Sequence, residues 1–219
     1  MPGLFVSFEG GDGSGKSTQI ARLAARLQSL GIDPVVTREP GGTAVAEGIR
    51  ALLLERPERR GGAREPGPTR LAEALLMVAA RADLVEKVLR PALESGRVVL
   101  CDRYADSTLA YQGGGRGLDA GLLEGWNRAA TGGLVPDLTL YFDLDPEVGL
   151  ARRTGVAGSS NRIDAESLEF HRRVRARYLE LAAAEPARWL VLDASAAPDT
   201  LEVAVWSAVE SRRRGPVRA

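Results

Sequence analysis

A glycine-rich segment near the N-terminus carries the clearest chemical signal in this sequence. Gly10-Gly11-Asp12-Gly13-Ser14-Gly15-Lys16-Ser17 satisfies the pattern G-x-x-x-x-G-K-[ST], between an apolar run and a helical pattern. Glycines let the backbone wrap so that its N–H groups converge on phosphate oxygens, and the following helix N-terminus favours negative charge. In such a loop Lys16 bridges the β- and γ-phosphates, and Ser17 is a Mg²⁺ ligand. The motif therefore predicts a nucleoside triphosphate site with Mg²⁺, and by itself it does not choose between a GTPase, an ATPase and a small kinase. The contacting residues are expected to be Gly10, Gly11, Asp12, Gly13, Ser14, Gly15, Lys16, Ser17 and Thr18.

Other residue types narrow the class of reaction. The Asn-Lys-x-Asp segment by which a GTPase reads guanine does not occur in the chain. Asp102 ends an apolar run, where a carboxylate can orient Mg²⁺ or its waters, although it could also merely cap the next turn. No general base is visible, and a phosphate monoester, with a second pKa of about 6, needs none. The pattern therefore favours phosphoryl transfer to a phosphate acceptor over transfer to an alcohol.

Further segments resemble the thymidylate kinase family along nearly the whole chain. The residues that carry the resemblance are Phe8–Thr18, Thr37-Arg38-Glu39-Pro40-Gly41-Gly42-Thr43, Asp102-Arg103-Tyr104, Ser107–Gly114, Pro136–Leu140 and Asn161–Asp164. The second and fourth of these are far more specific than the phosphate loop. The resemblance implies an ATP-dependent kinase that converts thymidine monophosphate to its diphosphate, and a homodimer.

By that resemblance, Arg50 and Arg103 bind the acceptor phosphate, for which planar guanidinium groups are well suited. Asp12 is expected to face the sugar hydroxyl and the phosphate of the acceptor, and Tyr111 to exclude a 2′-hydroxyl. The residues implied around thymine are Met77, Arg81, Ser107, Thr108 and Gln112. Met77 stands where the family usually has a phenylalanine stacked on the base. Helical spacing puts it on the same face as Arg81, so we expect it to contact the ring.

The family often places an arginine after the acidic residue of the phosphate loop, but Gly13 stands there. We therefore expect the catalytic positive charge on a lid of about residues 152–162, from Arg152, Arg153 or Arg162. The inserted residues Val156–Ser160 depart from the family pattern and leave open which arginine acts.

Apolar runs alternate with helical patterns, which predicts an α/β domain of residues 1–211 with the P-loop NTPase fold. The five strands expected in its parallel sheet are Leu4–Phe8, Pro34–Thr37, Arg97–Cys101, Leu138–Leu144 and Trp189–Leu192. The helical patterns follow Lys16, run over Leu71–Leu89 and Ser167–Glu185, begin at Pro146 and follow Pro198. Loops are expected at Arg56–Thr69 and Gly155–Ser160.

Composition excludes several classes of protein. Lys+Arg and Asp+Glu both number 29, so no global field attracts nucleic acid; we expect residues 212–219 to be a disordered basic tail. The single cysteine, Cys101, argues for a reducing compartment, and no run is long enough to span a membrane; we expect a cytoplasmic protein. His171 has no metal-binding partners in the sequence pattern, and we expect it to be an ordinary helix residue.

Two alternative functions stay open: another nucleotide or nucleoside kinase, and a nucleotide-dependent module that binds nucleic acid through its tail.

Overall fold

The computed structural model describes residues 3–54, 67–154 and 162–214. A five-stranded parallel sheet in the order β2-β3-β1-β4-β5 lies at its centre. The strands are β1 (Leu4–Gly10), β2 (Val35–Arg38), β3 (Val98–Asp102), β4 (Leu138–Asp143) and β5 (Trp189–Asp193). All five strands predicted from the sequence are present, with ends within about two residues of the expected ones.

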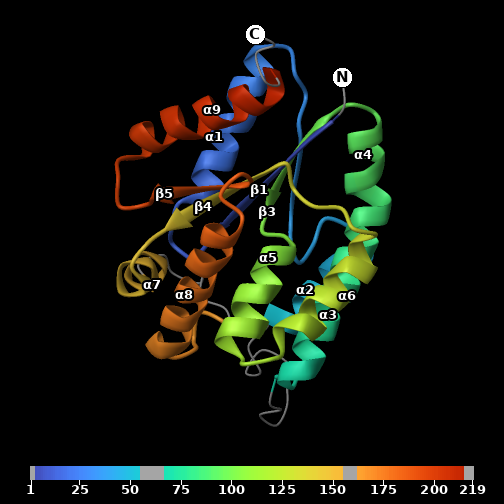
Figure 1. Ribbon diagram of the computed structural model, residues 1–219, viewed down its shortest axis with the longest axis vertical. Helices are drawn as coiled ribbons and strands as arrows, with labels where there is room; N and C mark the ends of the chain where they lie inside the picture. The colour runs from blue at the N-terminus through green and yellow to red at the C-terminus, as the bar shows by residue number, and fades with distance from the viewer. Residues whose placement is uncertain (1–2, 55–66, 155–161, 215–219) are drawn as a thin grey trace.

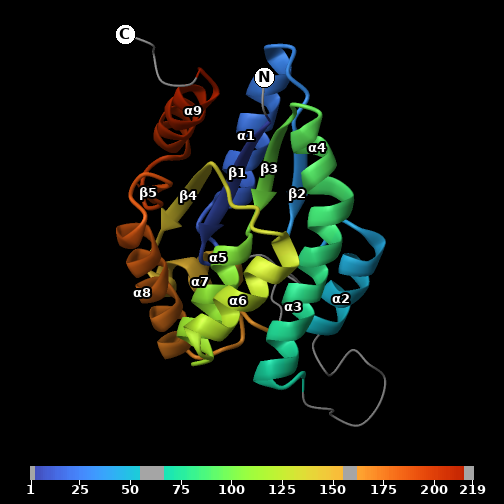
Figure 2. The same cartoon turned by 45° about the vertical axis from the view of Figure 1, so that its right-hand side comes forward.

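Helices cover both faces of the sheet, as Figures 1 and 2 show. In chain order they are α1 (Lys16–Ser29), α2 (Ala44–Leu54), α3 (Arg70–Leu84), η2 (Val85–Leu89), α4 (Arg90–Glu94), α5 (Ala105–Thr108), η3 (Leu109–Gly115), α6 (Ala120–Thr131), α7 (Pro146–Thr154), α8 (Leu168–Ala184) and α9 (Pro198–Arg214). The segments η2 and η3 are π-helical. The pattern expected over Leu71–Leu89 is therefore one continuous rod made of α3 and η2, and it runs on into α4.

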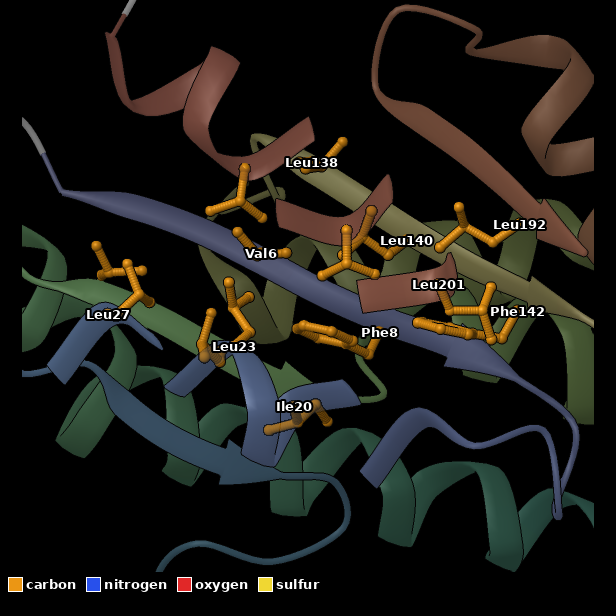
Figure 3. Packing of buried hydrophobic residues seen from close by; sticks show 14 of the residues in the cluster. Val6, Phe8, Ile20, Leu23, Leu27, Leu138, Leu140, Phe142, Leu192 and Leu201 are labelled. Carbon is orange, nitrogen blue, oxygen red and sulfur yellow. The ribbon is translucent and has the colours of Figure 1, made fainter. Parts of the chain in front are cut away.

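One face of the sheet is covered by α1 and α9. Figure 3 shows Val6 and Phe8 of β1 among the apolar side chains of these helices and of β4, with Ile20 and Leu23 on α1. The rings of Phe8 and Phe142 stack with centroids 6.1 Å apart. Because side chains alternate along a strand, the residues between these point to the opposite face.

The opposite face carries the remaining long helices. Phe5 packs there beside α3, η2 and α4, whereas Tyr141 and Trp189 pack against α8 and η3. Helices α5, α7 and α8 lie in the lower half of Figure 1, below the labelled strands. Ligands of open α/β sheets bind outside the carboxyl ends of the strands, so the cleft is expected at the end where β1 and β3 lead into α1 and α5.

Two of the expectations fall partly or wholly outside the described residues. The loop Arg56–Thr69 is described only from residue 67 on, and Gly155–Ser160 is not described at all. The basic tail differs from the expectation: helix α9 continues through Arg212–Arg214, and Arg214 pairs with Glu210 one turn earlier at 2.6 Å. None of the helices in the described ranges combines the length and apolarity needed to cross a bilayer.

Candidate active site

The glycine-rich segment joins β1 to α1, as its flanking patterns predict. Lys16 begins α1 and is buried, and its ammonium group donates hydrogen bonds to the carbonyls of Gly10 at 3.0 Å and Gly11 at 2.9 Å. Burial, together with nearby Arg103, lowers the pKa of Lys16. The lysine is thus folded over the loop that would hold phosphate, where an anion can take over its hydrogen bonds.

Gly13 packs directly against α7. Its φ is +76°, and a Cβ at this position would lie 2.3 Å from the carbonyl oxygen of Gly149. Any side chain here would have to displace α7, so an arginine cannot simply be placed in this loop. The contact agrees with the expectation that the catalytic positive charge is not carried by this position.

Asp102 and Ser17 form the second part of the phosphate side. Ser17 Oγ donates to Asp102 Oδ2 at 3.2 Å, while Asp102 Oδ1 is buried and has no hydrogen-bond partner among the described residues. An unpartnered carboxylate oxygen beside a hydroxyl is a donor set that suits Mg²⁺, which keeps several waters and takes only one or two protein ligands besides phosphates. These two residues therefore fit the metal predicted from the sequence.

Arg103 also lines the cleft, and its backbone is in a strained conformation. Its φ of +72° is in the left-handed region, which non-glycine residues seldom occupy and which often marks functional sites. The guanidinium pairs with Asp12 at 3.2 Å and lies 4.9 Å from the centre of the Tyr111 ring. Burial raises the pKa of Asp12, but Arg103 and Lys16 outweigh it and hold that pKa below its usual value. A charged donor is thus held ready where the acceptor phosphate is expected.

Arg50 approaches the same cleft from α2. Its Nη1 donates to the carbonyl of Pro40 at 2.8 Å, and its side chain lines the cleft beside Arg38. Helical spacing alone could not bring Arg50 and Arg103 together, because they come from α2 and from the loop after β3. The structure places both at the same cavity.

Glu9 was missed by the sequence analysis and lies at the centre of a buried hydrogen-bond network. It accepts from the backbone N–H of Tyr104 at 2.7 Å, from Ser107 Oγ at 2.6 Å and from the Tyr178 hydroxyl at 2.8 Å. Burial, with Asp106 nearby, raises its pKa to about 7. Glu9 therefore positions Ser107 and the start of α5 from behind the cleft. Its place directly before Gly10 of the glycine loop, on the strand that leads into it, was the only available signal.

Arg81 is fully buried and bound on all sides. Its Nε and Nη2 donate to Glu39 Oε2 at 2.9 and 2.6 Å. Its Nη1 donates to Thr108 Oγ1 at 2.9 Å and Asn127 Oδ1 at 2.6 Å, and Nη2 also reaches the carbonyl of Tyr104 at 3.1 Å. Every N–H group of the guanidinium thus has an acceptor in the protein. A base oxygen can therefore contact Arg81 only by sharing one of these donors.

A cleft of about 500 Å³ connects these groups, within the range of small-molecule sites. Besides the residues above, it is lined by Met77, Thr108, Tyr111 and Gln112. The predicted acceptor residues are thus gathered on one cavity with the phosphate loop, of which Gly10 and Gly11 lie just beyond the lining.

The three predicted lid arginines are not placed alike. Arg152 and Arg153 line the cleft; Arg152 donates to the carbonyl of Gly13 at 3.4 Å, and Arg153 pairs with Asp164 at 3.3 Å. Arg162 is not part of the lining and instead binds the buried carboxylate of Glu73 on α3. Because its guanidinium is bound to Glu73 on α3, Arg162 lies outside the cleft lining.

Comparison with known proteins identifies the family of this chain. The thymidylate kinase family model matches residues 8–204. Thymidylate kinases of Thermomicrobium roseum and Deinococcus radiodurans are 53% and 52% identical, over 96% of this chain and 97% and 98% of theirs. The chain belongs to the thymidylate kinase family. A solved thymidylate kinase from Ehrlichia chaffeensis superposes with a TM-score of 0.74 at 31% identity, covering 95% of this chain and 99% of that one.

Membership of the thymidylate kinase family confirms the family and the fold class predicted from the sequence. Cys101 and His171, which were given no functional role in the sequence analysis, do not line the cleft. Cys101 is a buried free thiol at the end of β3, and burial raises its pKa well above the ordinary value. His171 is buried on α8 with its ring against Phe170. The individual site roles remain predictions.

Proposed function

We propose that the protein transfers the γ-phosphoryl group of ATP to thymidine monophosphate in this cleft. The observation that carries the proposal is the gathering of two sets of cationic groups in one cavity: Lys16 with its loop, and Arg103 with Arg50. Two phosphate groups bound by these sets would lie in the same cavity, and such positioning is a large part of phosphoryl-transfer catalysis.

The residues have separate roles in this reaction. Lys16 and the loop N–H groups hold the triphosphate of ATP, and Arg103 with Arg50 hold and orient the acceptor phosphate. The attacking oxygen is already anionic near neutral pH, since the second pKa of a phosphate monoester is about 6. Arg152 and Arg153 are the groups available to stabilise the charge that develops on the transferred phosphoryl group.

The proposed reaction also uses Mg²⁺. Ser17 and Asp102 would hold it, as the unpartnered Asp102 Oδ1 supports. When bound, the ion supplies neutralising charge to the β- and γ-phosphates. The chain's own residues hold the substrates in the cleft.

A substrate panel tests the proposal directly. Purified protein is assayed with ATP and Mg²⁺ against thymidine, thymidine monophosphate and the other nucleoside monophosphates, with product identified by chromatography. We expect phosphorylation of thymidine monophosphate well above any other acceptor. Preference for a nucleoside, or for another monophosphate, would refute the assignment of the acceptor.

A homodimer is the proposed assembly. Exposed apolar side chains lie on the adjoining helices α2, α3 and α6, and they are Val45, Leu71, Leu75 and Leu122. Such a surface is typical of subunit contacts. Sedimentation should give a dimer for the wild type and a monomer for the double variant Leu71→Glu, Leu75→Glu. Val203→Glu, an exposed change on α9, is the matched control and should remain dimeric. A monomeric wild type would contradict the proposal.

The remaining partners and the location follow from the same reaction. ATP and thymidine monophosphate are the expected small-molecule partners, and binding to nucleic acid or membranes is not part of the proposed function. We place the protein in the cytoplasm, and the buried, unpaired thiol of Cys101 supports a reducing compartment.

A further inference from the structure

Glu73 on α3 is a buried carboxylate surrounded by donors. Its side chain is 1% exposed, yet it does not contact the phosphate loop. Gln112 Nε2 donates to its Oε1 at 2.9 Å, and Arg116 binds both oxygens at 3.1 and 3.0 Å. Arg162 binds Oε2 as well. Two segments far apart in the chain, residues 112–116 and residue 162, thus converge on one charge next to the acceptor cleft.

The protonation state of Glu73 follows from these contacts. Burial raises its pKa, but the hydrogen bonds from Arg116 and Arg162 outweigh burial, and the pKa ends below its ordinary value. Glu73 is therefore ionised at neutral pH. An ionised carboxylate only accepts hydrogen bonds, so it can face only the N–H end of a carboxamide.

Gln112 is the one of these partners that lines the acceptor cleft. It lies on the π-helical segment η3, a type of turn that is frequent at functional sites. With its nitrogen turned to Glu73, its carbonyl oxygen is the end left for a ligand. We propose that Glu73 is a positioning residue that presents the Gln112 carboxamide as an acceptor and thereby selects bases with an N–H at ring position 3.

This selection has a simple chemical basis, and it rests on the proposed binding of the base beside Gln112. Thymine carries a hydrogen on N3, whereas N3 of cytosine carries a lone pair. A carbonyl oxygen can accept from the first and is left unpaired opposite the second. Leaving a buried polar group unpaired weakens binding by about 5- to 150-fold. Without Glu73 the amide can rotate and meet either base with a matching end.

The test compares kcat/KM for thymidine and deoxycytidine monophosphates in the wild type and four variants. Glu73→Gln, whose side chain can donate as well as accept, should raise KM for thymidine monophosphate, and the thymidine-to-cytidine ratio should fall at least about fivefold. The KM for ATP and kcat with thymidine monophosphate should stay near wild type. Arg116→Gln is the matched control: it removes a charge partner of Glu73 but keeps the bond to Gln112, so its ratio should not change.

Gln112→Ala and the double variant separate the possible failures. If Gln112→Ala keeps wild-type KM and ratio, the base does not lie beside Gln112 and the proposed placement fails. If Gln112→Ala lowers the ratio but Glu73→Gln behaves like Arg116→Gln, the positioning role of Glu73 is overturned. In the double variant, Glu73→Gln should add nothing to the ratio change of Gln112→Ala, and additive changes would contradict the proposal.

Should Glu73→Gln fail to fold, the wild type decides the question. The side-chain amide signal of Gln112, assigned by its loss in Gln112→Ala, is followed by NMR with and without thymidine monophosphate. We expect one amide proton that exchanges slowly in both states because it stays bound to Glu73. Fast exchange of both protons in the complex would overturn the proposal.

Discussion

Met77 offers a sharp test of how the cleft holds thymine. It is half-buried on α3 and packs against the cluster that contains Tyr111, and it lines the cleft one helical turn before Arg81. A thioether against an aromatic ring contributes about 0.3–1.5 kcal/mol, whereas a base stacked on an aromatic side chain contributes about 1–3 kcal/mol. The difference of about 1 kcal/mol corresponds to a factor of about five in affinity.

We therefore expect Met77→Phe to tighten binding of thymidine monophosphate severalfold and Met77→Ala to loosen it by about fivefold. Lys16 and Asp102 lie elsewhere in the cleft, so affinity for ATP should hardly change in either variant. Titration calorimetry of the three proteins with each nucleotide measures both effects, and thermal unfolding reports on packing separately. Equal acceptor affinity in all three, with only the melting temperature changed, would show that Met77 belongs to the core alone.

Three further predictions address the phosphate chemistry and the buried network. Lys16→Ala and Asp102→Ala should each lower kcat by about 100-fold or more with a native circular-dichroism spectrum, and near-normal turnover would refute the role of that residue. Replacing Arg152 or Arg153 should reduce kcat much more than it raises KM for thymidine monophosphate; wild-type kcat in both would mean that the charge has another source. Because the pKa of Glu9 is raised from 4.5 to about 7, the folded state keeps a proton that the unfolded state loses in this range. Stability should therefore fall as pH rises from 4.5 to 7, by roughly 3 kcal/mol from this group, and no further above it. Urea unfolding should show a flatter dependence in Glu9→Gln, and identical slopes in the two proteins would contradict the assignment.

Most of the fold could be predicted because its signals are local. The strands are short apolar runs, and the buried ones have nearly continuous hydrophobic patterns, as parallel strands require. The glycine loop was recognisable because a tight anion-binding turn needs a fixed spacing of small residues before a helix. Sequence patterns did not separate α3 from η2, because η2 has only 5 residues, too few for its i→i+5 hydrogen bonding to show in the apolar spacing.

The electrostatic arrangement of the site was decided by the tertiary structure. Glu9 with Tyr178, and Glu73 with Arg162, are pairs separated by 169 and 89 positions along the chain. Residue types alone assign Arg162 to the same lid charge as Arg153, and only the fold shows that a buried carboxylate holds one of them away from the cleft. The sequence by itself determined the family, the phosphate loop and the set of available arginines. Which of these arginines line the cleft depended on the tertiary structure, because a charge removed from water must bind the nearest opposite charge that the fold supplies.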